Sequence, residues 1–253
     1  MPLLLALLLA GHFGIGQLSA QPAATQPVAS AASSLKFRPQ TTGMASVRVT
    51  GGSRGFRPPT TGAETVRVTG GSRGTDSATI TLDVLAPDDI GLTTQEQPSL
   101  FWYQSQPADA KFELTLLQEK QIKPLVQVKV DRASKAGFQR LKLSEHGVKL
   151  SPGVEYQWVV ALVTDPENRS TDLVASGVIK RVEPATDVKQ KISQAAPASL
   201  PSIYAEAGIW YDAIATLSDQ IEAQPENKTL RETRADLLQQ VGLKAAAQAE
   251  AAK

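Results

Sequence analysis

The sequence predicts a mainly β protein with a helical end: a seven-strand antiparallel β-sandwich followed by a segment of two to three helices. Three observations predict this fold. Short apolar runs alternate with turn residues between residues 76 and 183, a tyrosine corner motif precedes the sixth run, and the apolar spacing becomes helical after residue 201.

The first 20 residues have the pattern of an export signal. Residues 3–10 are an unbroken apolar run, and Leu18-Ser19-Ala20 forms a small-residue cleavage site. The run is shorter than the roughly 20 residues of a membrane span; a buried core strand is the alternative. We therefore expect a periplasmic or extracellular protein without a transmembrane span. Residues 21–35, rich in Pro, Ala, Ser and Thr, are predicted to be a flexible linker.

Residues 36–75 form an arm with a tandem repeat of 19 residues. The copies Phe37–Gly55 and Phe56–Gly74 are identical at 15 of 19 positions. Two copies are too few for a solenoid, which needs at least three repeats to bury a shared core. The arm is predicted to be largely irregular, apart from a possible short strand in each copy at 47–49 and 66–68. Deleting the first copy is expected to leave stability unchanged, because it adds no core.

The arm is also basic, with seven Lys and Arg residues and one acidic residue, Glu64. It is expected to be either a solvated linker or a segment that binds acidic glycans or lipid headgroups. Nucleic acid is not expected as a partner, because the protein is expected to be exported and its net charge is only +1. The residues that would bind an anionic surface are Arg48, Arg54, Arg57, Arg67 and Arg73.

Seven compact or alternating apolar runs, separated by Pro and Gly turns, predict the strands of the sandwich at 76–183. These runs are Thr79–Leu85, Ser99–Gln104, Lys111–Leu117, Leu125–Val130, Phe138–Leu143, Val154–Thr164 and Leu173–Val182.

The segment Leu150-Ser-Pro-Gly-Val-Glu-Tyr156 resembles the L-x-P-G-x-x-Y corner of fibronectin type III domains. In such immunoglobulin-like sandwiches the corner tyrosine bonds back to the backbone a few residues upstream. Trp102 stands where that family has its second-strand tryptophan. Trp102, Tyr156 and Trp158 are therefore expected to be structural residues of the core.

After a predicted linker at 184–201, the apolar residues Trp210, Ile214, Leu217 and Ile221 fall on one helical face. A second set between residues 230 and 241 completes a predicted helical hairpin at 202–243, and the Ala-rich tail at 244–253 is expected to be a helical tail that frays. The spacing resembles one tetratricopeptide unit, which cannot bury its own apolar face. Its aromatic residues therefore either pack on the sandwich or bind a partner; the candidates are Tyr204, Trp210 and Tyr211.

Several motifs together resemble the bacterial domain-of-unknown-function 928 family, over about residues 56–243. They are the GGSRG turn before the first strand, the strand Pro98–Tyr103, the Tyr156-Gln-Trp158 strand and the stretch Tyr204–Ala213 with its Ala-Gly-Ile-Trp-Tyr-Asp-Ala core. The resemblance implies an exported protein and no defined activity. Family members often carry a cysteine directly after the GGSRG-type motif. Thr75 stands at that position here, so no role of that thiol carries over.

The residue inventory disfavours catalysis. The absence of cysteine excludes disulfides, thiol catalysis and cysteine metal sites. A Ser-His-Asp hydrolase would need His146, which lies in a polar turn, and no G-x-S-x-G motif is present. The acidic loop at 165–172 lacks the order of a calcium loop and is expected to be solvated. No cofactor or metal is expected.

We therefore expect an exported, non-catalytic interaction or scaffolding module of the bacterial cell envelope that binds another protein. Binding of envelope glycan or an anionic surface by the basic arm is the alternative, and an uncharacterised enzyme is the third possibility.

Overall fold

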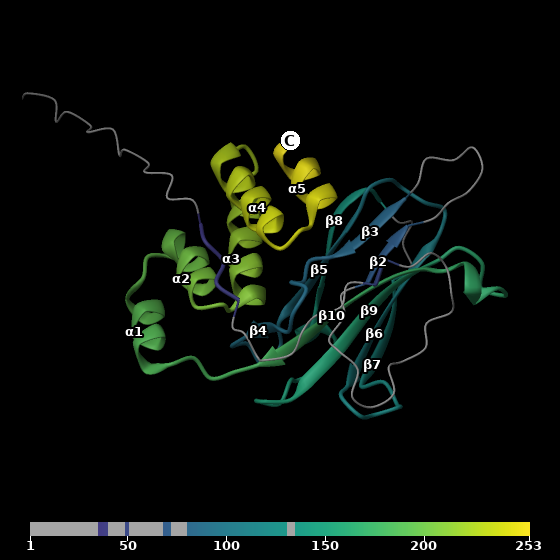
Figure 1. The fold of residues 1–253 in the computed structure, drawn as a ribbon, viewed down its shortest axis with the longest axis horizontal. Helices are drawn as coiled ribbons and strands as arrows, with labels where there is room; N and C mark the ends of the chain where they lie inside the picture. The colour runs from purple at the N-terminus through teal and green to yellow at the C-terminus, as the bar shows by residue number, and fades with distance from the viewer. Residues whose placement is uncertain (1–34, 40–48, 51–67, 72–79, 131–134) are drawn as a thin grey trace, which may run out of the picture. The chain divides into compact units, whose positions relative to one another are not determined.

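The computed structural model describes residues 35–39, 49–50, 68–71, 80–130 and 135–253. Within these residues, ten strands precede five α-helices along the chain. Figure 1 shows the strands on one side and the helices on the other. The predicted combination of a β-sandwich with a helical carboxyl end is confirmed.

All seven predicted strands are present, with bounds within two residues of those predicted, because Pro and Gly turns mark their ends. They are β3 (Thr81–Val84), β5 (Ser99–Gln104), β6 (Lys111–Gln118), β7 (Val126–Val130), β8 (Gly137–Lys142), β9 (Glu155–Val163) and β10 (Leu173–Arg181). The structure adds three short strands, which are β1 (Val49–Thr50), β2 (Val68–Gly71) and β4 (Gly91–Thr93).

The strands form two layers that β2 joins. One layer has the antiparallel order β7-β6-β9-β10, and the other has the antiparallel order β3-β5-β8. Strand β2 pairs with β10 in the first layer and with β3 in the second. At the two ends of this path lie β7 and β8, and each of them pairs on one side only with the strands that the structure describes.

The prediction of a wholly antiparallel sheet is wrong at two places. Strand β4 runs parallel to the end of β10, with Gly91 opposite Ile179. Strand β1 runs parallel to β2, and its register places Val49 of the first repeat copy opposite the equivalent Val68 of the second. Strand β10 is long enough for β2 and β4 to pair with different parts of one edge, with β2 opposite Ser176.

The tyrosine corner is present. The Ser151 backbone N–H donates to the Tyr156 hydroxyl oxygen at 3.0 Å, and the ring is buried. Trp102 and Trp158 are buried too, and Trp102 packs edge-on against Phe112 with ring centroids 5.3 Å apart. Trp102, Tyr156 and Trp158 thus occupy the core positions expected of them.

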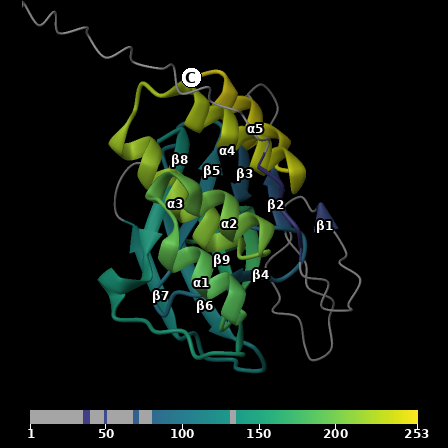
Figure 2. The same ribbon diagram turned by 90° about the vertical axis from the view of Figure 1, so that its left-hand side faces the viewer.

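The helical end is larger than predicted, with five helices instead of two or three. Figure 2 shows that they gather on one side of the strands. They are α1 (Thr186–Gln194), α2 (Leu200–Glu206), α3 (Trp210–Ala223), α4 (Lys228–Gln240) and α5 (Lys244–Ala251). Among the described residues, no helix is both long enough and apolar enough to span a membrane.

Two helices correct the predicted domain plan. Helix α1 lies in the predicted linker 184–201, where Val188 and Ile192 supply a short apolar stripe that packs on the core. Helix α5 lies in the tail that was expected to fray. It is held in place because Glu250, which is fully buried, pairs with Arg234 at 2.8 Å, and because Ala246 packs without exposure.

Residues 35–39 are docked on the helices. Leu35 is buried, and the Phe37 ring lies edge-on to Trp210 with centroids 4.9 Å apart. The Gln240 side chain holds the backbone: the Phe37 N–H donates to its Oε1 at 2.8 Å, and its Nε2 donates to the Leu35 carbonyl at 2.6 Å. The expectations that the linker is flexible up to residue 35 and that the first repeat copy adds no core are therefore wrong at these residues.

We expect Phe37→Ala to lower the free energy of unfolding by about 1–2 kcal/mol, because it removes a half-buried ring and its contact with Trp210. Urea unfolding of the full chain measures the change. Lys36→Ala is the matched control, because Lys36 is exposed between the two anchoring residues. Equal, small changes in both variants would show that this contact adds no stability.

Candidate functional site

The sequence-predicted site residues fall into two groups. The arginines of the arm lie outside the described residues; they are Arg48, Arg54, Arg57, Arg67 and Arg73. The partner-binding candidates Tyr204, Trp210 and Tyr211 are buried, with 7%, 0% and 1% exposure. Of the two alternatives for these aromatic residues, packing within the protein and binding of a partner, the structure shows the first. None of the three offers an exposed ring to a partner.

Trp210 and Tyr211 fasten α3 to the sandwich by hydrogen bonds. The Trp210 indole N–H donates to the Leu85 carbonyl at 2.8 Å. The Tyr211 hydroxyl accepts from the Trp158 indole N–H at 2.7 Å and donates to the Val178 carbonyl at 3.1 Å. Burial raises the pKa of the Tyr211 phenol far above its usual value, so this hydroxyl stays neutral and serves as a structural bridge.

Two glycines let the helix and strands approach each other. A Cβ atom on Gly91 in β4 would overlap the Tyr211 ring. A Cβ atom on Gly177 in β10 would lie 2.6 Å from the Ala86 Cβ and 3.3 Å from the Trp158 indole nitrogen. A side chain at Gly91 would push Tyr211 and α3 away from β4, and one at Gly177 would displace Ala86 and crowd Trp158.

Asp212 completes the attachment of α3. Its carboxylate is buried and accepts from the Thr93 hydroxyl at 2.5 Å and from the Thr94 backbone N–H at 3.0 Å, and the Thr94 hydroxyl is a third donor. Burial raises the pKa of Asp212, and the hydrogen bonds from the two threonines oppose that rise. The segment 207–213, the most distinctive motif of the sequence, is therefore the docking surface of α3.

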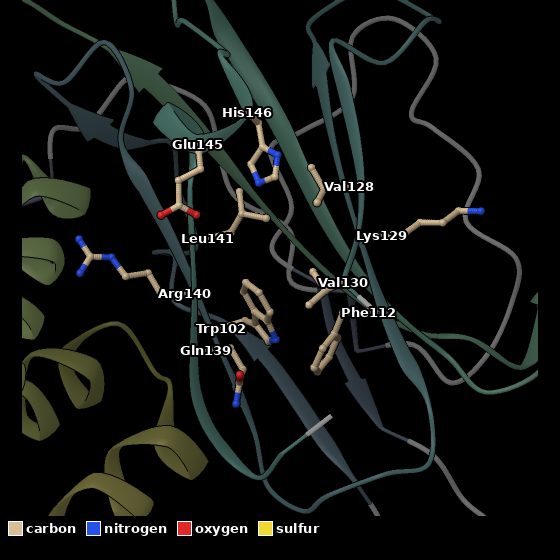
Figure 3. Close-up of a pocket in the computed structure, with 10 residues that line it drawn as sticks. All are labelled: Trp102, Phe112, Val128, Lys129, Val130, Gln139, Arg140, Leu141, Glu145 and His146. Atoms are coloured by element: carbon tan, nitrogen blue, oxygen red, sulfur yellow. The ribbon is translucent and has the colours of Figure 1, made fainter. Parts of the chain in front are cut away.

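A separate pocket of about 230 Å³ lies on the open side of the sandwich, between the edge strands β7 and β8. Figure 3 shows Val128 and Val130 of β7 across the cavity from Leu141 and Trp102, with Glu145 and His146 at one end. The full lining comprises Trp102, Phe112, Val128, Lys129, Val130, Gln139, Arg140, Leu141, Glu145 and His146.

Trp102 carries an unpaired donor at this pocket. Its side chain is 2% exposed, and its indole N–H has no acceptor among the described residues. The two other tryptophans, Trp158 and Trp210, both donate at 2.7–2.8 Å. A buried donor without an acceptor costs about 1–3 kcal/mol. The fold thus satisfies two buried indoles and leaves the third without an acceptor among the described residues.

Two further polar candidates, His146 and Asp172, lie at the ends of short 3₁₀ turns. His146 is exposed at the end of the 3₁₀ turn Leu143–His146, the polar turn that the sequence predicts. Asp172 is paired with Arg169 at 2.6 Å. No group of three or more His, Asp or Glu side chains in the described part of the chain is arranged to hold a metal ion.

The hairpin of β6 and β7 also carries exposed apolar side chains. Ile122 is 95% exposed and Leu125 is 48% exposed, and both lie in the loop that leads into β7. Sequence reasoning assigned no binding role to this hairpin or to Trp102. The available signal was the alternation of Val126, Val128 and Val130 with polar residues, but which side of β7 stays unpaired depends on the tertiary fold.

Comparison with known proteins gives one informative match. No curated protein matches the chain. A solved multi-domain immunophilin from Arabidopsis thaliana is 11% identical, and the alignment covers 69% of this chain and 94% of that chain. Its TM-score of 0.17 is too low to indicate a shared fold. The model of the family Domain of Unknown Function (DUF928) matches residues 68–251, which include β2, the pocket and all five helices. This chain therefore belongs to the DUF928 family.

Proposed function

We propose that this protein is an exported, non-catalytic interaction module of the cell envelope that binds another protein along the open side of its sandwich. The observation that carries the proposal is the pair of strand edges at β7 and β8, which flank a pocket lined by both apolar and polar side chains. The export pattern of residues 1–20 supports the location.

An unpaired strand edge is a template for another chain. Its backbone N–H and C=O groups pair with an added strand, and pockets beside the edge select alternate side chains. Among the described strands, β7 presents such an edge, with Val128 and Val130 toward the pocket and Lys129 outward. The exposed Ile122 and Leu125 lie in the loop of the same hairpin, and exposed apolar side chains tend to mark interfaces when they gather in patches.

The charge of the arm favours a second function. Its seven basic residues against one acidic residue suit acidic glycans or lipid headgroups. This function would use the arm, whereas protein binding would use β7 and β8, so the two are separable by position.

Site-directed photocrosslinking in native envelopes tests the proposal. A photoreactive residue replaces Lys129 on β7 in one variant and Lys191 on α1 in the control; both side chains are exposed, and they lie on different parts of the molecule. We expect a discrete protein adduct from position 129 that is absent from position 191. The same adducts from both positions, or glycan adducts only, would contradict a protein-binding edge at β7.

A further inference from the structure

We infer that the surface of α2, α3 and α4 that holds residues 35–39 is a binding site for a short linear motif of another protein. The motif is an extended segment with an apolar residue at one position and phenylalanine two positions later. The chain's own segment is the resident ligand of this site, and a segment of the partner takes its place. This inference goes beyond the proposed function, because it uses the helices and not the edges of β7 and β8.

The first step concerns how the backbone of the segment is held. The Gln240 side chain in α4 accepts from the Phe37 N–H at 2.8 Å and donates to the Leu35 carbonyl at 2.6 Å. The Arg38 N–H donates to the Ala205 carbonyl in α2 at 3.1 Å. Figure 1 shows the segment beside α2 and α3. All three hydrogen bonds use backbone groups of the segment, so they restrict its sequence only by excluding proline at the two donor positions.

The second step concerns the side chains that the site selects. Leu35 is buried, and the Phe37 ring lies edge-on to Trp210. Side chains two positions apart in an extended segment lie on the same side of it. Lys36 between the two anchors and Arg38 after them are exposed. The site therefore selects an apolar residue and a phenylalanine, and leaves the position between them open, as in other complexes that recognise extended peptides.

The third step separates the site from its occupant. The three residues that contact the segment, Ala205, Trp210 and Gln240, lie within residues 68–251, which match the family model, and residues 35–39 precede that match. The site is thus part of the family domain, and the segment that fills it comes from outside that domain. Neither the three hydrogen bonds nor the two anchors require a covalent link between segment and domain. The same motif on another chain meets the same partners.

Another protein is a better source of the motif than a second copy of this chain. Each copy already fills its own site, so an exchange of segments between two copies forms no additional contact and costs the entropy of association. A tethered segment also competes at an effective concentration of about millimolar. A foreign segment displaces it by covering more of the site, and the half-buried Phe37 leaves ring surface uncovered.

Fluorescence anisotropy of a labelled peptide tests the inference. The probe is the capped heptapeptide of residues 34–40, Ser-Leu-Lys-Phe-Arg-Pro-Gln. The protein is the full chain with Leu35→Ser and Phe37→Ser, which remove both anchors of the resident segment. We expect saturable binding to this double variant and about tenfold weaker binding to the wild type, where the resident segment competes. No binding to the double variant at millimolar peptide, or equal binding to both proteins, would overturn the inference.

The second repeat copy supplies a matched control peptide. Residues 53–59, Ser-Arg-Gly-Phe-Arg-Pro-Pro, keep the Phe-Arg-Pro sequence but place Arg54 where the first peptide has Leu35. We expect about tenfold weaker binding of this peptide, because burial of a charged side chain without a partner is unfavourable. A version of the first peptide with Leu35→Arg alone isolates this position. Equal affinities for all three peptides would contradict the selected motif.

The clamp is tested on the protein side. Gln240→Ala, added to the double variant, is expected to weaken binding of the first peptide about tenfold, through loss of its two hydrogen bonds to the peptide backbone. Gln239→Ala is the matched control, because the neighbouring Gln239 is exposed and its side chain would lie about 100° away around α4. An equal effect of both substitutions would place the peptide elsewhere and reject the site.

A proton–nitrogen spectrum of the wild type keeps the inference testable if the double variant does not fold. Excess peptide of residues 34–40 is expected to move the Phe37 and Arg38 amide signals, because displacement breaks their hydrogen bonds, and to leave the Trp158 indole signal in place. Amide signals that stay unmoved at millimolar peptide would show that the resident segment does not exchange, and the inference fails. Sedimentation identifies the partner: wild-type dimers that the double variant lacks would point to a second copy and reject the assignment to another protein.

Discussion

A chain that ends at Val182 is expected to lose its cooperative fold. The hydrophobic core is one cluster that contains side chains of both the sandwich and the helices, including Trp158, Trp210 and Leu217. Removal of α1–α5 exposes the apolar surface around Leu85 and leaves the Trp158 indole N–H without its acceptor. A buried large side chain contributes about 1.5–3 kcal/mol, and α3 alone supplies several, while a domain has only about 5–15 kcal/mol of net stability.

Near-ultraviolet circular dichroism and urea unfolding of the truncated and full chains measure this effect. We expect weak near-ultraviolet signals, a broad transition or aggregation in the truncated chain. A cooperative transition at the same urea midpoint as the full chain would show that the sandwich is independent of the helices, and that the contacts of α3 are not part of its core.

The accuracy of the strand prediction has a local cause. Each of the seven runs is bounded by residues that stop a strand, such as Pro107 before β6 and Pro152-Gly153 before β9. Strand β4 was missed because Gly91–Thr93 is too short to show a period, and its partner β10 lies about 90 residues away along the chain. Parallel pairing of this kind is a property of the tertiary fold.

Helix α5, which the sequence predicts as a fraying helical tail, shows how distant contacts override local sequence. The segment 244–253 consists mainly of Ala with scattered charges, a composition that frays when isolated. In the fold, Glu250 meets Arg231 and Arg234 of α4, and Lys253 and Arg234 both lie over the Phe138 ring at 5.1 and 4.4 Å. These partners are far apart in sequence, so the local pattern gave no sign of them.

The two aromatic residues at the start of α3 are buried by two different segments that lie far apart in the sequence. Trp210 and Tyr211 point about 100° apart on the helix, which predicts more aromatic surface than a hairpin hides. Phe37 of the arm packs on Trp210, and Trp158 of the sandwich bonds to Tyr211. Each of the two rings is thus buried by a different segment of the chain. The sequence identified which residues matter, and the structure identified what they bind.

The pocket could not be predicted, because its walls come from strands that meet only in the folded sandwich. Trp102 in β5 and Val128 in β7 belong to different layers, joined through the cavity and not by pairing. The sequence correctly predicts that Trp102 is buried. It carries no information on whether the indole N–H has an acceptor, since that depends on the position of every neighbouring carbonyl.

Tyr211→Phe is expected to lower the free energy of unfolding by about 1–3 kcal/mol, although it removes only one oxygen atom. The Tyr211 hydroxyl is the acceptor for the buried Trp158 N–H and a donor to the Val178 carbonyl. The variant leaves the buried Trp158 N–H without its acceptor and the half-buried Val178 carbonyl without this donor, and an unmade buried hydrogen bond costs that amount. Tyr211→Ala also opens a cavity, and we expect a total loss of about 3–5 kcal/mol.

Tyr204→Phe is the matched control, because Tyr204 is a buried ring on the neighbouring helix α2 whose hydroxyl forms no hydrogen bond with any residue that the structure describes. Its unfolding midpoint in urea should stay close to that of the wild type, whereas that of Tyr211→Phe falls. The Trp158 indole signal in a proton–nitrogen spectrum should shift in Tyr211→Phe alone. If both tyrosine variants unfold at the wild-type midpoint, the Trp158–Tyr211 bridge contributes nothing, and α3 is held by apolar packing and Asp212.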